Sequence, residues 1–80
     1  MRRIGVVRNF FHQRGFGFLR VLTDGKPARV DSSLPDVFFH VKELKLAGID
    51  SDEIKSGDTL EFDITDFPKG LVASKIAVVQ

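Results

Sequence analysis

Apolar and polar residues alternate along several short stretches of this chain. The clearest case is Thr-Leu-Glu-Phe-Asp-Ile-Thr at 59–65, where Leu60, Phe62 and Ile64 would share one face of a half-buried strand. Other short runs are rich in β-branched and aromatic residues, which favour strands. We therefore predict strands at 4–11, 16–22, 37–41, 59–65 and 71–79, although the alternation in the last is imperfect.

Turn-forming residues separate these strands. Polar and glycine-containing segments at 12–15, 23–27, 56–58 and 67–70 predict turns, and 24–34 predicts a loop of moderate length. Between 41 and 54 the apolar spacing changes, which predicts a short helical turn and an irregular connection. Short strands without a long helix indicate an all-β fold, a small antiparallel barrel whose closure removes exposed edges.

Two phenylalanine clusters stand out from this pattern. Side chains two apart on a strand point to the same side, so Phe16 and Phe18 share a face and Gly17 adds no bulk to the other. Phe38 and His40 likewise share a face. Flat rings left exposed beside basic residues suit stacked bases and phosphates, so we predict that Phe16, Phe18 and Phe38 bind a ligand.

Other apolar residues are assigned to the core or left open. Val37 and Phe39 oppose Phe38 and His40 across their strand, so we expect both in the core. One of Phe10 and Phe11 should point inward; a bulge near Gly5 would decide which, and we place Phe10 on the binding side.

For two further aromatic side chains, the sequence leaves two possible roles open. His40 either stacks on a ligand or is a partly buried structural histidine. Phe67, beside Pro68, either caps the barrel or contacts a ligand.

Charge is distributed unevenly along the chain. Residues 1–30 carry a net charge of +6 and residues 31–80 a net charge of −5, which together give the overall +1. An anionic partner would be drawn to the basic half. The alternative is that the charges scatter over the surface, because halves of a sequence need not be halves of a fold.

Composition excludes several classes of function. With no cysteine there is no disulfide and no thiolate metal site, and no apolar run reaches the length of a signal peptide or a membrane span. The chain has two histidines, no phosphate-cradling glycine loop and no carboxylate cluster with metal-ligand spacing; the acidic run 50–53 fits a solvated turn. We predict a single cytoplasmic domain over 1–80 that is not an enzyme and uses no cofactor, metal, membrane or small-molecule substrate.

The residues at 5–19 and 36–40 resemble the two nucleic-acid-binding motifs of the cold shock domain family. The segments 56–62 and 68–73 resemble that family's entry to the fourth strand and its last turn, and the resemblance extends from about residue 3 to 79. RNA-recognition-motif domains carry a similar first motif, but they place the other motif earlier in the chain and need two amphipathic helices.

The resemblance implies an OB-fold, a five-stranded antiparallel Greek-key barrel with a long irregular connection between the third and fourth strands. It implies binding of single-stranded RNA or DNA, as an RNA chaperone or transcript regulator. Carried over position by position, the implied nucleic-acid-binding residues are Arg8, Phe10, Arg14, Phe16, Phe18, Phe38, His40 and Lys69.

The sequence also departs from the family's pattern. The family usually has Trp at the position of Asn9, Phe at that of Val41 and an aromatic residue at that of Ile49, and the loop 24–34 is longer than usual. Each stacked base contributes about 1–3 kcal/mol. We therefore predict binding weaker than is typical by roughly one to three decades, even if Phe11 and Phe67 replace two of the rings.

An alternative function is a protein-interaction or dimerisation module on a barrel of this type whose base-stacking face has been eroded. We expect a monomer, or a weak or strand-exchanged dimer.

Overall fold

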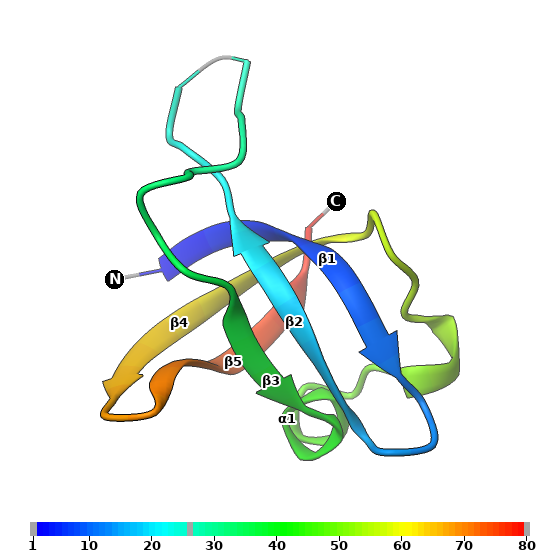
Figure 1. Ribbon diagram of the computed structural model, residues 1–80. Coiled ribbons are helices and arrows are strands. Elements are labelled where there is room, and N and C mark those ends of the chain that lie inside the picture. The colour runs from blue at the N-terminus through cyan, green and yellow to red at the C-terminus, as the bar shows by residue number, and fades with distance from the viewer. Residues whose placement is uncertain (1, 26, 80) are drawn as a thin grey trace.

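The computed structural model describes residues 2–25 and 27–79 and consists mainly of β-strands (Figure 1). The strands are β1 (Arg2–Phe11), β2 (Phe16–Val21), β3 (Val37–His40), β4 (Thr59–Phe67) and β5 (Gly70–Val78). Each predicted strand is present, and no strand end differs from its predicted position by more than two residues. The predicted turn at 23–27 includes residue 26, which lies outside the described residues.

The strands form a closed barrel in the order β1-β2-β3-β5-β4, because β1 pairs with both β2 and β4. The predicted all-β, five-stranded barrel is confirmed. One pairing runs parallel rather than antiparallel: β3 and β5 close the barrel, with Val37 beside Leu71 and Phe38 beside Val72. This pairing brings the last strand next to the second phenylalanine cluster.

Two short helices carry the chain from β3 to β4. The helix α1 (Val41–Leu46) begins after His40, whose Nδ1 accepts a hydrogen bond from the Lys42 amide at 3.0 Å. The 3₁₀ helix η1 (Ser51–Glu53) begins after Asp50, which caps it through the Asp52 amide. These helices form the irregular connection that the sequence predicts. Within residues 2–25 and 27–79, no helix is long and apolar enough to cross a membrane.

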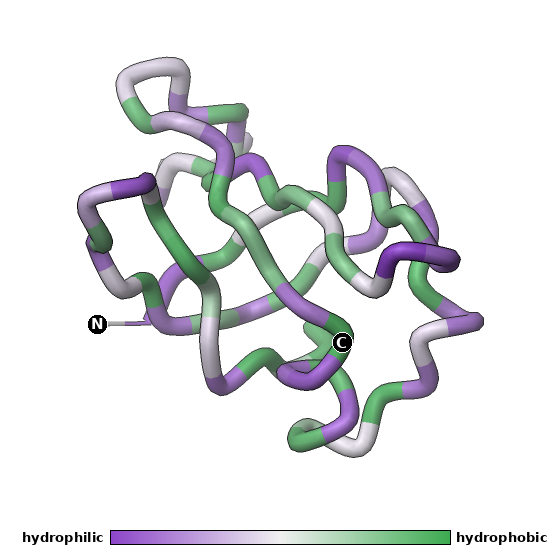
Figure 2. The backbone as a smooth tube through the Cα atoms, turned by 60° about the horizontal axis from the view of Figure 1, so that its bottom comes forward, coloured by the Kyte–Doolittle hydropathy of each residue, from purple (hydrophilic) through white to green (hydrophobic). Residues whose placement is uncertain are grey.

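The core occupies the inside of the barrel, where inward-facing positions of all five strands meet Leu44 of α1. Figure 2 shows hydrophobic and hydrophilic positions alternating along the strands, the pattern expected when one side of each strand is buried. Phe39, Val37 and Phe62 are fully buried, as predicted.

Two glycines let phenylalanine rings fill this small core. A Cβ at Gly17 would lie 2.8 Å from Cζ of Phe39, and one at Gly5 would lie 2.8 Å from Cζ of Phe62. Gly5 therefore marks a close approach. The bulge predicted near Gly5 lies instead between Val7 and Asn9, where the β1–β2 register shifts by one residue.

The segment between β2 and β3 projects from one end of the barrel (Figure 1). Its base is fixed by a bridge between Leu22 and Val30 and by a hydrogen bond of 2.7 Å from the Asp31 amide to the Val21 carbonyl. The carboxylate of Asp31 accepts hydrogen bonds from the hydroxyl and the amide of Ser33 and lies 3.9 Å from the Arg3 guanidinium. The long loop is thus attached to the barrel at its base.

Candidate functional site

Four phenylalanine rings gather on the outside of β1, β2 and β3. Phe11 lies opposite Phe16 in the β1–β2 pairing, and Phe18 lies opposite Phe38 in the β2–β3 pairing. Opposed residues of antiparallel strands project to the same side of a sheet. We call Phe11, Phe16, Phe18 and Phe38 the aromatic face.

The rings of the aromatic face contact one another. The ring centroids of Phe11 and Phe16 are 5.2 Å apart, those of Phe16 and Phe38 are 5.6 Å apart, and those of Phe18 and Phe38 are 5.9 Å apart. Phe16 and Phe38 are stacked, with 28° between their planes. Phe11 is exposed and the other three rings are half-buried. The face is therefore a continuous apolar surface whose rings restrict one another's orientation.

Phe10 is absent from this face, so its predicted placement on the binding side is wrong. Its ring stacks on Phe39 with the centroids 5.5 Å apart and packs against the core. The cause is the bulge between Val7 and Asn9: the additional residue exchanges the two sides of β1, turning Phe10 inward and Phe11 outward. Phe11 takes the place that the sequence assigned to Phe10.

The predicted basic residues have different surroundings. The guanidinium carbon of Arg14 lies 5.6 Å from the ring centroid of Phe16, within range of a cation–π interaction. Arg8 forms an ion pair with Asp36. Lys69 belongs to the turn between β4 and β5 and lines a groove beside Phe38.

His40 lies opposite Phe16 at the end of β3, and its side chain is exposed. It has a structural task, because its Nδ1 caps α1. The ring is nevertheless at the edge of the aromatic face, so capping and ligand contact are compatible.

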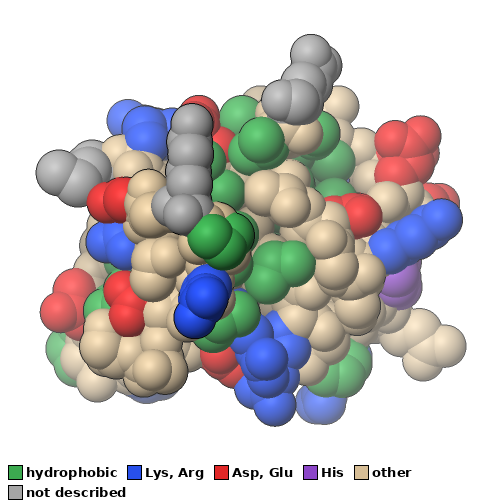
Figure 3. Space-filling model, turned by 90° about the horizontal axis from the view of Figure 1, so that it is seen from above, with side chains coloured by type: hydrophobic (Ala, Val, Ile, Leu, Met, Phe, Trp, Pro, Cys, Tyr) green, Lys and Arg blue, Asp and Glu red, His purple; other side chains and the backbone are tan. Residues whose placement is uncertain are grey.

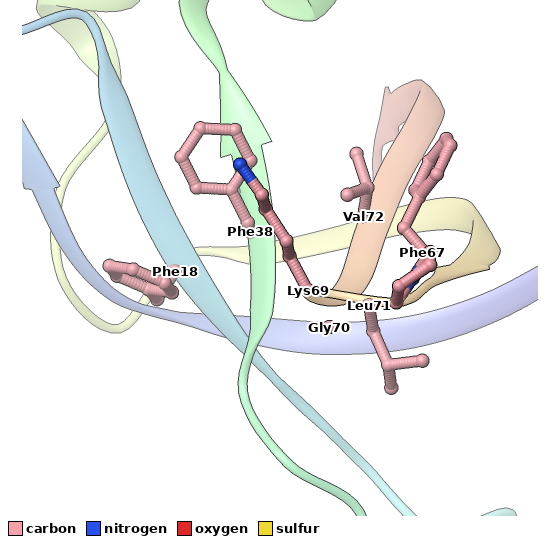
Figure 4. A pocket seen from close by; sticks show the side chains of 8 residues that line it. Phe18, Phe38, Phe67, Lys69, Gly70, Leu71 and Val72 are labelled. Carbon is pink, nitrogen blue, oxygen red and sulfur yellow. The ribbon is translucent and has the colours of Figure 1, made fainter.

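A groove adjoins the aromatic face on the side of β5. It is about 590 Å³ in volume, is lined by Phe18, Phe38 and residues 67–72, and is almost entirely apolar. Figure 4 shows Phe38 and Phe67 on either side of Val72, with Lys69 reaching toward Phe38 from the turn. Phe67 is 49% exposed and is not part of the core. Of its two proposed roles, this position favours contact with a ligand over capping the barrel.

The sequence did not assign Leu71 and Val72 to this groove, because the parallel pairing of β3 and β5 places them there. No local sequence motif predicts such a pairing between strands that are far apart in the chain.

The three positions that depart from the family's pattern have different surroundings. Asn9 is opposite Phe18, and its Oδ1 is buried with no hydrogen-bond partner within the described part of the chain. Val41 begins α1, and its amide donates to the Gly15 carbonyl at 2.8 Å. Ile49 packs against the core. None of these side chains offers a flat ring.

Ion pairs in the folded protein reduce the charge separation that is seen along the sequence. Arg2 pairs with Glu61 and Asp63, while Arg3 and Arg8 pair with Asp31 and Asp36. Figure 3 shows acidic and basic side chains interspersed on the face viewed from above. The basic first half of the chain is thus partly neutralised by the acidic second half.

Comparison with known proteins gives one result. A family model described as the 'Cold-shock' DNA-binding domain matches residues 3–79, nearly the whole chain. A search of curated proteins found no match. The match includes all four rings of the aromatic face and the residues that line the groove.

Proposed function

Because the chain belongs to the 'Cold-shock' DNA-binding domain family, a family of nucleic-acid-binding domains, we propose that it binds single-stranded RNA or DNA by stacking unpaired bases on the aromatic face. The observation that carries this proposal is the continuous surface of contacting rings on the outside of the barrel. Every base has an apolar π-face, so such a surface accepts bases with little regard to sequence.

The surrounding residues suit the sugar-phosphate backbone. Arg14 lies over one edge of the aromatic face and Lys69 lines the groove at another, so both cations can approach phosphates while bases stack between them. His40, at the end of β3, adds a ring at the rim. The proposed binding residues are therefore Arg8, Phe11, Arg14, Phe16, Phe18, Phe38, His40 and Lys69.

Capture of single strands would give the protein the activity of an RNA chaperone or transcript regulator. Stacking competes with base pairing, so the protein would shift weak RNA hairpins toward their open form in proportion to its affinity for the open strand. No covalent step is required, and we propose that the protein is not an enzyme.

The proposed affinity is below that of a family member with the usual aromatic set. Asn9, Val41 and Ile49 supply no stacking surface, and Arg8 is occupied by Asp36. Phe11 offsets part of this loss. At about 1–3 kcal/mol for each ring, a net deficit of one or two rings corresponds to roughly one to three decades in the dissociation constant.

Truncation of two rings tests the aromatic face. Phe16→Ala and Phe38→Ala should each weaken binding of a pyrimidine-rich DNA about tenfold or more, because each removes a platform for a base. Fluorescence anisotropy of a labelled oligonucleotide measures the affinity, since the chain has neither Trp nor Tyr. Circular dichroism shows whether the barrel is retained.

Leu46→Ala is the control, because Leu46 is 74% exposed on α1 and apart from the aromatic face. Wild-type affinity in both phenylalanine variants would exclude base stacking on this face.

The exposed rings also favour one alternative, a docking surface for a protein partner or for a second copy of the chain. Salt distinguishes the two functions. Single-strand binding should weaken steeply with salt, by about 0.7 in the logarithmic slope for each phosphate contact. An apolar protein contact is not weakened in this way.

A further inference from the structure

The groove beside the aromatic face has the size of a site for a small flat group. Its volume is about 590 Å³, within the range of roughly 300–1,000 Å³ that is usual for small-ligand sites. Phe18 and Phe38 belong both to the groove and to the aromatic face, so a strand lying on the face leads directly into it.

The far wall of the groove is held in place by the turn between β4 and β5. Phe67 is the last residue of β4 and pairs with Gly70, the first residue of β5. Pro68, which lies between them, has a restricted φ, and Gly70 itself has a φ of 136°, a backbone conformation that residues with a side chain rarely adopt. The ring of Phe67 is therefore presented from a tight hairpin rather than from a free loop.

The floor of the groove is fixed by the closure of the barrel. Val72 lies beside Phe38 in the parallel pairing of β3 and β5. In Figure 4 the rings of Phe38 and Phe67 stand on either side of Val72. Since Phe38, Phe67 and Val72 all line the groove, a planar group bound there would have two aromatic rings and an aliphatic side chain among its neighbours.

A single cation accompanies this apolar lining. Lys69 is exposed at the tip of the turn, and the ion pairs found among the described residues involve Arg2, Arg3 and Arg8 but not Lys69. A planar apolar group with an adjacent negative charge fits these surroundings. In a nucleic acid this combination is a base with its neighbouring phosphate.

We propose that Phe67, with Phe38, Val72 and Lys69, forms a subsite for one further unpaired base and its phosphate, beyond the aromatic face. This inference rests on the proposed single-strand binding. The subsite lengthens the binding site toward β5 and replaces part of the stacking surface that is missing at Asn9, Val41 and Ile49. The groove offers few polar atoms, so the subsite distinguishes bases weakly.

Oligonucleotide length provides the first test. Binding of labelled oligothymidylates of about three to eight nucleotides is measured for the wild type, Phe67→Ala and Phe67→Leu. We expect both variants to lose roughly fivefold or more in affinity for oligonucleotides long enough to reach the groove, and to match the wild type for shorter ones. Phe67→Leu keeps an apolar side chain but no flat ring, so it separates stacking from simple cover of the groove.

A fluorescent base provides the second test. 2-Aminopurine, whose emission is quenched by stacking, is placed in turn at each position of the longest oligonucleotide that the protein covers. At saturating protein, quenching at one terminal position should be lost in Phe67→Ala and kept in the control Val78→Ala, which truncates an exposed residue of β5 outside the groove.

The outcomes separate this subsite from the proposed function. Suppose that Phe67→Ala and Phe67→Leu bind oligonucleotides of every length with wild-type affinity while Phe16→Ala binds more weakly. The proposed subsite is then excluded, and the proposal that bases stack on the aromatic face is retained. If the wild type binds no oligonucleotide of any length, the proposed function fails and the subsite fails with it.

Discussion

Arg8 and Asp36 form an ion pair that spans β2, because β1 and β3 lie on either side of that strand. The side chains are 49% and 30% exposed. Ion pairs with this degree of solvent access contribute about 0–1 kcal/mol. Arg8 can therefore exchange its carboxylate for a phosphate at small cost, but Asp36 repels that phosphate.

Removal of this carboxylate charge should strengthen single-strand binding. Asp36→Asn keeps the size of the side chain and frees Arg8, so we expect the affinity to rise a few-fold and the logarithmic salt slope to become steeper by about 0.7. Anisotropy titrations at several salt concentrations measure both quantities.

Glu61→Gln is the matched control. It makes the same change in net charge and removes a partner of Arg2 rather than of Arg8. Equal effects of the two substitutions would mean that only net charge matters, and Arg8 would then have no specific role.

The strand β2 combines two demands that only glycine satisfies at position 17. Its outward residues Phe16 and Phe18 carry the aromatic face, while Phe39 fills the barrel directly beneath Gly17. Because Gly17 has no side chain, the buried ring of Phe39 can pack directly against the strand whose other side carries Phe16 and Phe18. The binding surface and the core are therefore coupled through one short strand.

Gly17→Ala should disrupt this coupling. The added Cβ would lie 2.8 Å from Cζ of Phe39 and would press on the Asn9 carbonyl. Forced overpacking of a core typically costs about 1–3 kcal/mol. We expect a decrease of this size in the free energy of unfolding, measured by urea denaturation.

Gly25→Ala tests whether the cost comes from crowding. Apart from the residues next to it in the chain, no atom of the described residues lies within 4 Å of the Cβ position at Gly25, so its substitution should change stability by less than about 0.5 kcal/mol. A similar loss in both variants would contradict crowding against Phe39 and the Asn9 carbonyl as the cause, because the loss of glycine's conformational freedom in the unfolded chain by itself favours the alanine variants.

The same strands show how far the sequence alone specifies this site. Two-residue alternation was sufficient to place Phe16, Phe18 and Phe38 outside and Phe39 and Phe62 inside, because these strands are regular. It failed for Phe10 because the bulge between Val7 and Asn9 depends on pairing with β2. The groove was out of reach for a related reason, since the pairing of β3 with β5 leaves no local signal.

At the scale of the whole molecule, ion pairs connect segments that are far apart in the sequence, as the strand pairings of the barrel also do. The arginines at the start of β1 pair with acids from positions 31–63, so the +6 and −5 halves of the sequence meet across the fold. We therefore expect the attraction of nucleic acid to depend on local cations such as Arg14 and Lys69 rather than on an overall basic half.

The contacts of Asp31 with Ser33 and Arg3 should make the stability of the fold depend on pH. Hydrogen bonds from Ser33 lower the pKa of Asp31 below its ordinary value of 3.8, and Arg3 adds to the effect. A carboxylate with a lowered pKa in the folded state stabilises the fold above the unfolded-state pKa, and this contribution is lost as the pH falls through the folded-state pKa. Asp31→Asn should thus be less stable than the wild type at neutral pH, and the difference should shrink below about pH 3.8.

Urea denaturation between about pH 2 and pH 7 measures this difference. Asp24→Asn is the control, because it removes one carboxylate charge from the same loop without touching the hydrogen bonds between Asp31 and Ser33. A constant difference between Asp31→Asn and the wild type across the whole range would exclude the ionised carboxylate as the stabilising form.

The parallel pairing of β3 with β5 also sets the order in which a growing chain can acquire its activity. The groove joins Phe18 and Phe38 to residues 67–72, so a nascent chain that has reached only β3 has the first rings but neither the far wall of the groove nor a closed barrel. Contacts between such distant positions also slow folding. During synthesis, therefore, β5 must leave the ribosome before the barrel can close and the groove can form.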